Sequence, residues 1–139
     1  MSEPSRVSVK WAGDQLYDFG RMGRPSARLD GDGATAPSPV DALLGALGSC
    51  VSYDVVEILA KRRTPVESLE VEVVAKRVDT IPRHLEHVTL NFRIGGAGVE
   101  RVHAERAVEL AVTKYCSVRS SLRPDVPVEW TIALAAETA

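Results

Sequence analysis

The sequence predicts an α+β protein that forms a single domain over residues 1–139. Two observations support this fold class. Several consecutive short segments alternate apolar and polar residues, which is the pattern of strands with one buried face. One long helical segment separates the first run of such segments from the second, so strands follow strands and do not alternate with helices. We therefore expect an antiparallel sheet wrapped around a long central helix.

Three short strands are expected before the helix. Apolar and polar residues alternate over residues 7–11, and shorter strand patterns follow at 16–19 and 27–29. Glycine-containing turn signals separate the three segments. Residues 30–37 are rich in Gly, Asp and Pro, a composition typical of a loop.

The long helix is expected to begin at Pro39 and to end at Arg63. Ser38 suits the N-cap position, and Pro39 suits the first helical position. Asp41 completes the pattern of a capping box with Ser38 and carries the charge that the N-terminal end of a helix favours. Basic residues fill the last turn, and Pro65 prevents continuation of the helix.

A hairpin, a second helix and a final strand are expected after the long helix. Alternating patterns over residues 69–76 and 88–94 predict two antiparallel strands. Apolar residues at helical spacing predict an amphipathic helix of about four turns over residues 104–115, with Cys116 at its end. Alternation over residues 128–134 predicts a closing strand.

Composition and charge argue against several classes of function. The net charge of −2 and the pI near 5.9 give no electrostatic reason to expect a nucleic acid or an anionic membrane as partner. The first residues lack the apolar core of a signal peptide, and acidic residues interrupt the most apolar segment, so no membrane span is expected. We expect a cytoplasmic protein whose two cysteines are mostly reduced.

The two cysteines are the first candidates for chemistry. Cys50 lies near the middle of the long helix and is either a small buried hydrophobic residue or a reactive thiol. Gly45 and Gly48 cost about 0.8–1.0 kcal/mol each relative to alanine, which indicates a close neighbour, either a packed helix or a small ligand. Cys116 would resolve a sulfenic acid on Cys50 only if the fold brings the thiols within disulfide reach, and sequence spacing does not decide this.

Arginines and histidines supply further candidates. Three arginines, Arg21, Arg24 and Arg28, lie close to the loop before the long helix. A guanidinium beside a thiol favours the thiolate and donates hydrogen bonds to a peroxide oxygen, and the alternative is a solvated charge at a strand end. The histidines have no cysteine or acidic cluster at metal-ligand spacing, so no metal is expected. These histidines are His84, His87 and His103.

Two segments of the chain resemble the OsmC/Ohr family. Residues 39–50 (PVDALLGALGSC) are similar to the family's central helix, and residues 107–118 are similar to the segment that holds its second cysteine. The order of expected elements matches the family over nearly the whole chain. The resemblance implies an intertwined homodimer in which sheets from both chains enclose the two central helices.

The resemblance also implies a thiol-dependent peroxidase that reduces organic hydroperoxides under oxidative stress. Cys50 matches the peroxidatic cysteine, which would form a sulfenic acid, and Cys116 matches the resolving cysteine, which would convert it to a disulfide. No bound cofactor is expected. An external dithiol reductant, dihydrolipoamide in characterised relatives, would restore the thiols.

The family's arginine and carboxylate match less closely. Residues 20–24 (GRMGR) resemble a family stretch that makes Arg21 the first match and Arg24 the second. Where the best-known members have a glutamate, this chain has Val40, and the acid Asp41 follows as in the OsmC-like branch. Asp41 is ~13–14 Å from Cys50 along one helix. Asp41 therefore either serves the active site of a partner subunit or only caps its own helix.

Two alternatives to a peroxidase remain open. The chain could keep the fold but bind a small apolar ligand without redox turnover, an interpretation that the displaced acid at Asp41 favours. It could also be a thiol-reactive sensor that forms the disulfide but lacks an efficient reductant.

Overall fold

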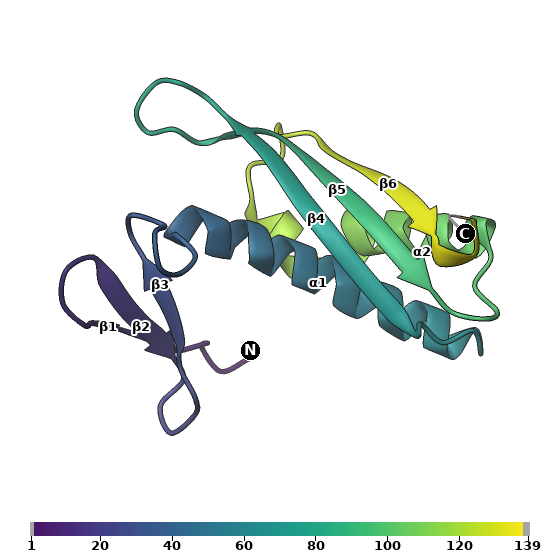
Figure 1. Cartoon of the computed structure of the whole chain (residues 1–139), viewed down its shortest axis with the longest axis horizontal. Helices are drawn as coiled ribbons and strands as arrows, with labels where there is room; N and C mark the ends of the chain where they lie inside the picture. The colour runs from purple at the N-terminus through teal and green to yellow at the C-terminus, as the bar shows by residue number, and fades with distance from the viewer. Residues whose placement is uncertain (1, 138–139) are drawn as a thin grey trace. The chain divides into compact units, whose positions relative to one another are not determined.

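The computed structural model describes residues 2–137 and divides the chain into two compact units, Met1–Leu43 and Leu44–Ala139 (Figure 1). The elements follow the predicted order. They are β1 (Ser8–Trp11), β2 (Leu16–Gly20), β3 (Ala27–Asp30), α1 (Pro39–Lys61), β4 (Ser68–Arg77), β5 (Leu85–Gly95), α2 (Arg101–Leu110), the π-helical turn η1 (Ala111–Tyr115), α3 (Ser117–Ser121), β6 (Val128–Leu134) and the 3-10 turn η2 (Ala135–Glu137).

The first unit is an antiparallel sheet in the order β1-β2-β3. Its three strands confirm the three predicted before the helix. The loop after β3 is ordered by the buried carboxylate of Asp30, which accepts hydrogen bonds from the backbone of Thr35, Asp32 and Ala34 and from the Thr35 hydroxyl. These bonds, the Thr35 backbone N–H first among them, hold the pKa of Asp30 below its usual value.

Helix α1 begins with the predicted capping box. The Ser38 N–H donates to Asp41 Oδ2 at 3.0 Å, and the Asp41 N–H donates to Ser38 Oγ at 3.1 Å. The two bonds satisfy backbone N–H groups that a helix start leaves unpaired. The Asp41 carboxylate thus has a local structural partner.

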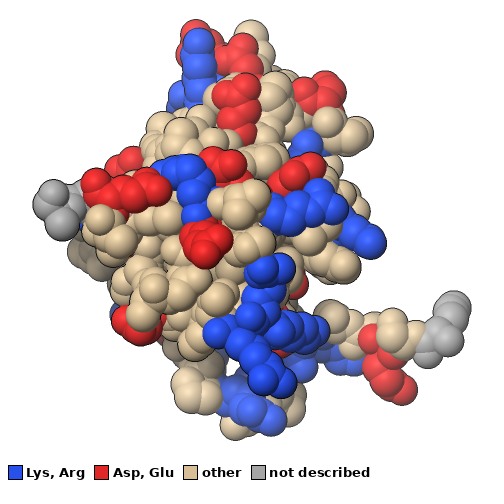
Figure 2. Space-filling model, turned by 90° about the vertical axis from the view of Figure 1, so that its right-hand side faces the viewer, with Lys and Arg blue, Asp and Glu red and all other residues tan. Residues whose placement is uncertain are grey.

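The C-terminal end of α1 corrects the prediction, because the helix ends at Lys61 and not at Arg63. Arg63 adopts the left-handed conformation with φ 66°. Its N–H donates to the Ala60 carbonyl and the Thr64 N–H donates to the Leu59 carbonyl, which is the pattern of a Schellman cap. Lys61 in the last turn complements the helix dipole. Figure 2 shows a group of Lys and Arg side chains on the face of the molecule that it presents.

The second unit contains a three-stranded sheet in the order β4-β5-β6. Strands β4 and β5 form the predicted antiparallel hairpin, but β6 pairs with β5 in parallel. The expected antiparallel pairing is therefore confirmed for β4 and β5, whereas β6 makes this sheet mixed. The physical reason is the crossover: α2, η1 and α3 carry the chain back so that β6 runs in the same direction as β5.

One face of α1 is buried in this second unit. Its buried side chains recur at helical spacing, and they are Leu47, Val51, Val55 and Leu59. Strand β5 contributes an inward row of buried side chains, which are Val88, Leu90, Phe92 and Ile94. Burial of such side chains is the main stabilising term of a fold of this size.

The opposite face of α1 stays apolar and exposed. Tyr53 and Val56 are 69% and 40% exposed. By length and composition alone, this helix would also qualify as a membrane span: it has 23 residues and a mean hydropathy of 1.5 over its most apolar window, of which 28% is buried. One such helix is weak evidence for a membrane span, because a helix that packs in a protein core passes the same test.

The two glycines before Cys50 have different surroundings. A Cβ at Gly48 would lie 2.9 Å from Val73 Cγ2 and 3.3 Å from Val71 Cγ1, whereas a Cβ at Gly45 would meet no atom within 4 Å. The close neighbour of Gly48 is thus strand β4, which is neither the packed helix nor the small ligand that the sequence suggested.

Candidate functional site

The local backbone around Cys116 is irregular. Helix α2 widens into the π-helical turn η1, in which the Cys116 N–H donates to the Ala111 carbonyl at 2.8 Å. Cys116 itself is extended, with φ −73° and ψ 108°, and it serves as the N-cap of α3. Its Sγ accepts a hydrogen bond from the Arg119 N–H at 3.2 Å. Single π-helical turns of this kind are frequent at functional sites.

The two cysteines, 66 positions apart in the sequence, interact through their side chains. Both are free thiols, with Cys116 buried (3% exposed) and Cys50 partly exposed. Burial raises the pKa of the Cys116 thiol to about 11, although the Arg119 backbone N–H opposes the shift. The neighbouring Cys50 side chain raises the pKa of Cys116 further by hydrogen bonding and by charge repulsion. Cys116 is therefore protonated at neutral pH.

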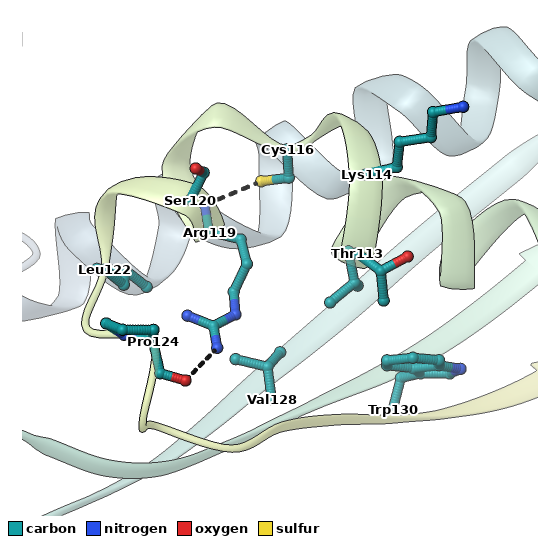
Figure 3. A pocket seen from close by; sticks show the side chains of 10 residues that line it. Thr113, Lys114, Cys116, Arg119, Ser120, Leu122, Pro124, Val128 and Trp130 are labelled. Carbon is teal, nitrogen blue, oxygen red and sulfur yellow. Dashed lines mark hydrogen bonds between the residues drawn. The ribbon is translucent and has the colours of Figure 1, made fainter.

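A cavity of about 660 Å³ opens beside Cys116 (Figure 3). Its wall is formed by η1, α3, the segment after α3 and β6. The lining residues are Val112, Thr113, Lys114, Cys116, Arg119, Ser120, Leu122, Pro124, Val128 and Trp130. Half of these side chains are apolar, and the charged ones are cationic. The cavity is large enough for a small organic molecule.

Arg119 fixes one wall of this cavity. Its guanidinium donates to the carbonyl oxygens of Arg123, Pro124 and Val126, at 3.1, 3.5 and 2.9 Å. Figure 3 shows the bond to Pro124. Sequence reasoning did not select Arg119. Arg119 lies three residues after Cys116, the spacing at which an N-cap side chain accepts a hydrogen bond from a backbone N–H. Cysteine, however, is not among the residues usually expected at an N-cap.

The arginines named from the sequence lie in the first unit and differ in their partners. Arg28 makes two hydrogen bonds of 2.9 Å to the Asp18 carboxylate, so it is occupied within its own sheet. This pairing lowers the pKa of Asp18. Arg21 and Arg24 are exposed in the turn after β2 and have no side-chain hydrogen bond or ion pair with the residues that the structure describes. Action of Arg21 or Asp41 on the thiols stays a prediction.

Two of the three histidines, His87 and His103, make side-chain polar contacts with residues other than the cysteines. His87 Nε2 lies 3.1 Å from Glu129 Oε2, and His103 Nε2 lies 2.8 Å from an Arg62 guanidinium nitrogen. Over residues 2–137, no group of three or more His, Cys, Asp or Glu side chains could hold a metal ion.

Comparisons with known proteins agree with this fold. The sequence model described as "OsmC-like protein" matches residues 30–131. Protein YhfA of Escherichia coli K12 is 37% identical over 124 residues, which cover 88% of this chain and 92% of that protein.

Solved structures give the same result. A hypothetical protein from Aquifex aeolicus superposes with a TM-score of 0.81 at 24% identity, covering 96% of this chain and 98% of that one. A Legionella pneumophila protein, described as organic hydroperoxide resistance protein OsmC, superposes with a TM-score of 0.69 at 15% identity, covering 95% and 99%. The family match spans more than half of the chain and includes both cysteines. The chain therefore belongs to the OsmC-like protein family.

Proposed function

We propose that this protein is a thiol-dependent peroxidase that reduces organic hydroperoxides. The observation that supports the proposal most is the interaction between the Cys50 and Cys116 side chains. A thiol that attacks peroxide needs a second thiol within reach to resolve its sulfenic acid. The name of the Legionella pneumophila structure, which refers to organic hydroperoxide resistance, supports this class of substrate.

The reaction has two steps on the protein. The Cys50 thiolate attacks the distal peroxide oxygen, so an S–O bond forms, the O–O bond breaks and the alcohol leaves with a proton. The Cys116 sulfur then attacks the Cys50 sulfenic acid, which forms the disulfide and releases water. An external dithiol donates two electrons and two protons to regenerate both thiols.

Exposure and acidity support this division of roles. Cys50 is the more exposed of the two cysteines, so a peroxide reaches it more easily. Cys116 is buried and its raised pKa of about 11 keeps it protonated, which makes it a poor first nucleophile. Once Cys50 is a sulfenic acid, the proximity of Cys116 compensates for its low reactivity.

The proposal includes a homodimer. The outward face of α1 exposes apolar side chains that a second copy of the chain would cover, among them Tyr53 and Val56. Asp41 is ~13–14 Å from Cys50 along α1, so any contribution of its carboxylate to catalysis would be to the partner subunit. Arg21, with no partner for its side chain among the described residues, is the arginine proposed to orient the peroxide.

The enzyme is further proposed to act in the cytoplasm with an external dithiol such as dihydrolipoamide. A turnover assay tests the proposal: reduced protein and dithiol are mixed with cumene hydroperoxide or with hydrogen peroxide, and peroxide loss is followed. We expect faster loss of the organic peroxide and no turnover by Cys50→Ser. Cys116→Ser is the matched variant that removes the second thiol, because the serine hydroxyl still accepts a hydrogen bond from the Arg119 N–H. Undiminished turnover by Cys50→Ser would refute the proposal.

One observation favours a second candidate function. The Asp41 carboxylate accepts a hydrogen bond from the Ser38 N–H, and position 40 holds valine where the best-known family members have glutamate. The second candidate is therefore a small-ligand-binding protein or a redox sensor. A disulfide that forms once and is not recycled by any dithiol would favour the sensor, and unreactive thiols would favour the ligand-binding protein.

A further inference from the structure

We propose that the reductant enters through the cavity beside Cys116 and attacks Cys116 Sγ, so that Cys50 is the sulfur released first. This inference rests on the proposed peroxidase function, in which the two cysteines form a disulfide. It assigns to the 660 Å³ cavity a ligand class, a small thiol or dithiol, and separates the path of the reductant from that of the peroxide.

The first argument is access. Cys116 lines the cavity, whereas Cys50 is not one of the lining residues. Figure 3 shows the Cys116 sulfur at the cavity wall, where it accepts the hydrogen bond from the Arg119 N–H. A disulfide between the two cysteines therefore presents the Cys116 sulfur to a molecule in this cavity. In thiol–disulfide exchange, the thiolate attacks the disulfide sulfur that it can reach, in line with the S–S bond.

The second argument is the character of the wall. Apolar side chains such as Leu122, Val128 and Trp130 suit the carbon chain of a small dithiol. The Arg119 guanidinium supplies positive charge, which favours the thiolate form of the incoming reductant. The Arg119 guanidinium is held by three backbone carbonyls, so this wall is preformed.

The third argument is the leaving group. Burial raises the pKa of Cys116 to about 11, and a thiol of high pKa leaves slowly in disulfide exchange. Attack on Cys116 avoids expelling this sulfur in the first step. The reductant thiolate forms an S–S bond with Cys116 Sγ, and the Cys50–Cys116 bond breaks with its electron pair on Cys50. The second thiol of the reductant then displaces Cys116, which takes up a proton, and the reductant leaves as a cyclic disulfide.

The test traps the mixed disulfide in wild-type protein. The disulfide is first installed with diamide, so that the test does not depend on peroxidase activity. A short exposure to 2-mercaptoethanol, a monothiol that cannot cyclise, is stopped with N-ethylmaleimide, and peptides are mapped by mass spectrometry. We expect mercaptoethanol on Cys116 and maleimide on Cys50. The reverse labelling overturns the inference.

Two variants test the entry path. Ser120 lines the cavity and Ser121, its neighbour on α3, does not, so Ser120→Trp blocks the cavity and Ser121→Trp is the matched control. We expect Ser120→Trp alone to slow reduction by dithiothreitol by about tenfold or more, while disulfide formation with peroxide keeps its rate. Equal slowing of both steps, or of neither, overturns the separate path.

The failures of the two proposals can be told apart. If diamide produces the disulfide and mapping assigns mercaptoethanol to Cys116, but no peroxide is consumed, only the peroxidase function fails. If diamide yields no Cys50–Cys116 disulfide, the pairing of thiols that both proposals need is refuted.

Discussion

Gly48 provides a quantitative test of how α1 packs on the second sheet. An alanine Cβ there would lie 2.9 Å from Val73 Cγ2 and 3.3 Å from Val71 Cγ1. Alanine gains about 0.8–1.0 kcal/mol of helix propensity over glycine, but overpacking a filled core typically costs about 1–3 kcal/mol. We therefore expect Gly48→Ala to lower the free energy of unfolding by up to about 2 kcal/mol.

Gly45 supplies the matched control on the same helix. A Cβ there meets nothing within 4 Å among the described residues, so Gly45→Ala should raise the free energy of unfolding by about 0.8–1.0 kcal/mol. The propensity gain is common to both variants, so their difference isolates the packing penalty of about 1–3 kcal/mol. Urea unfolding followed by circular dichroism, at one protein concentration, measures this difference.

A third variant tests the cause. Val73→Ala removes Val73 Cγ2, the atom closest to an added Cβ at position 48. Val73→Ala should therefore destabilise the Gly48→Ala protein less than it destabilises the wild type, and the difference, the coupling energy, should be of the order of 1 kcal/mol. If Gly48→Ala and Gly45→Ala stabilise the protein equally, the packing of α1 on β4 is refuted.

Three further predictions concern the ends of α1 and the buried thiol. Arg63→Gly should stabilise the protein by about 0.5–1 kcal/mol. Glycine relieves the strain of the left-handed conformation at φ 66°, and this gain exceeds the greater chain entropy that glycine loses on folding. Unchanged or lower stability in urea unfolding would contradict this prediction. Ser38→Ala should cost about 1 kcal/mol in the same assay through loss of the capping box, and no loss would show the cap to be unimportant. Because the pKa of Cys116 is raised to about 11, the free energy of unfolding should fall as pH rises from about 8.5, the pKa of an unfolded cysteine, towards 11. For the same reason, alkylation of Cys116 in a Cys50→Ser variant should stay slow below about pH 8.5. Rapid alkylation near pH 8 would contradict the raised pKa.

Local sequence signals predicted most of the fold. The capping box of Ser38 and Asp41 depends on contacts three residues apart, and the strand patterns depend on period-two alternation, so both are legible in the sequence. The true end of α1 was missed because Arg63 occupies a left-handed position where glycine is the usual signal.

Features set by long-range geometry could not be predicted in this way. The parallel pairing of β6 depends on how the crossover through α2 and α3 returns the chain, and the neighbour of Gly48 depends on how β4 packs. The sequence identified Cys50 and Cys116 as candidates, but only the fold brings their side chains together. The Arg119 backbone N–H donates to Cys116 Sγ, and its guanidinium donates to backbone carbonyl oxygens. Contacts with the backbone leave no pattern in side-chain types.

The most direct test of the paired thiols is mass spectrometry of reduced protein after one equivalent of cumene hydroperoxide. The account predicts a disulfide between the Cys50 and Cys116 peptides in wild type. In Cys116→Ser it predicts a sulfenic acid on Cys50, which dimedone traps. Dimedone labelling elsewhere, or two thiols that remain free while peroxide is consumed, would contradict the account.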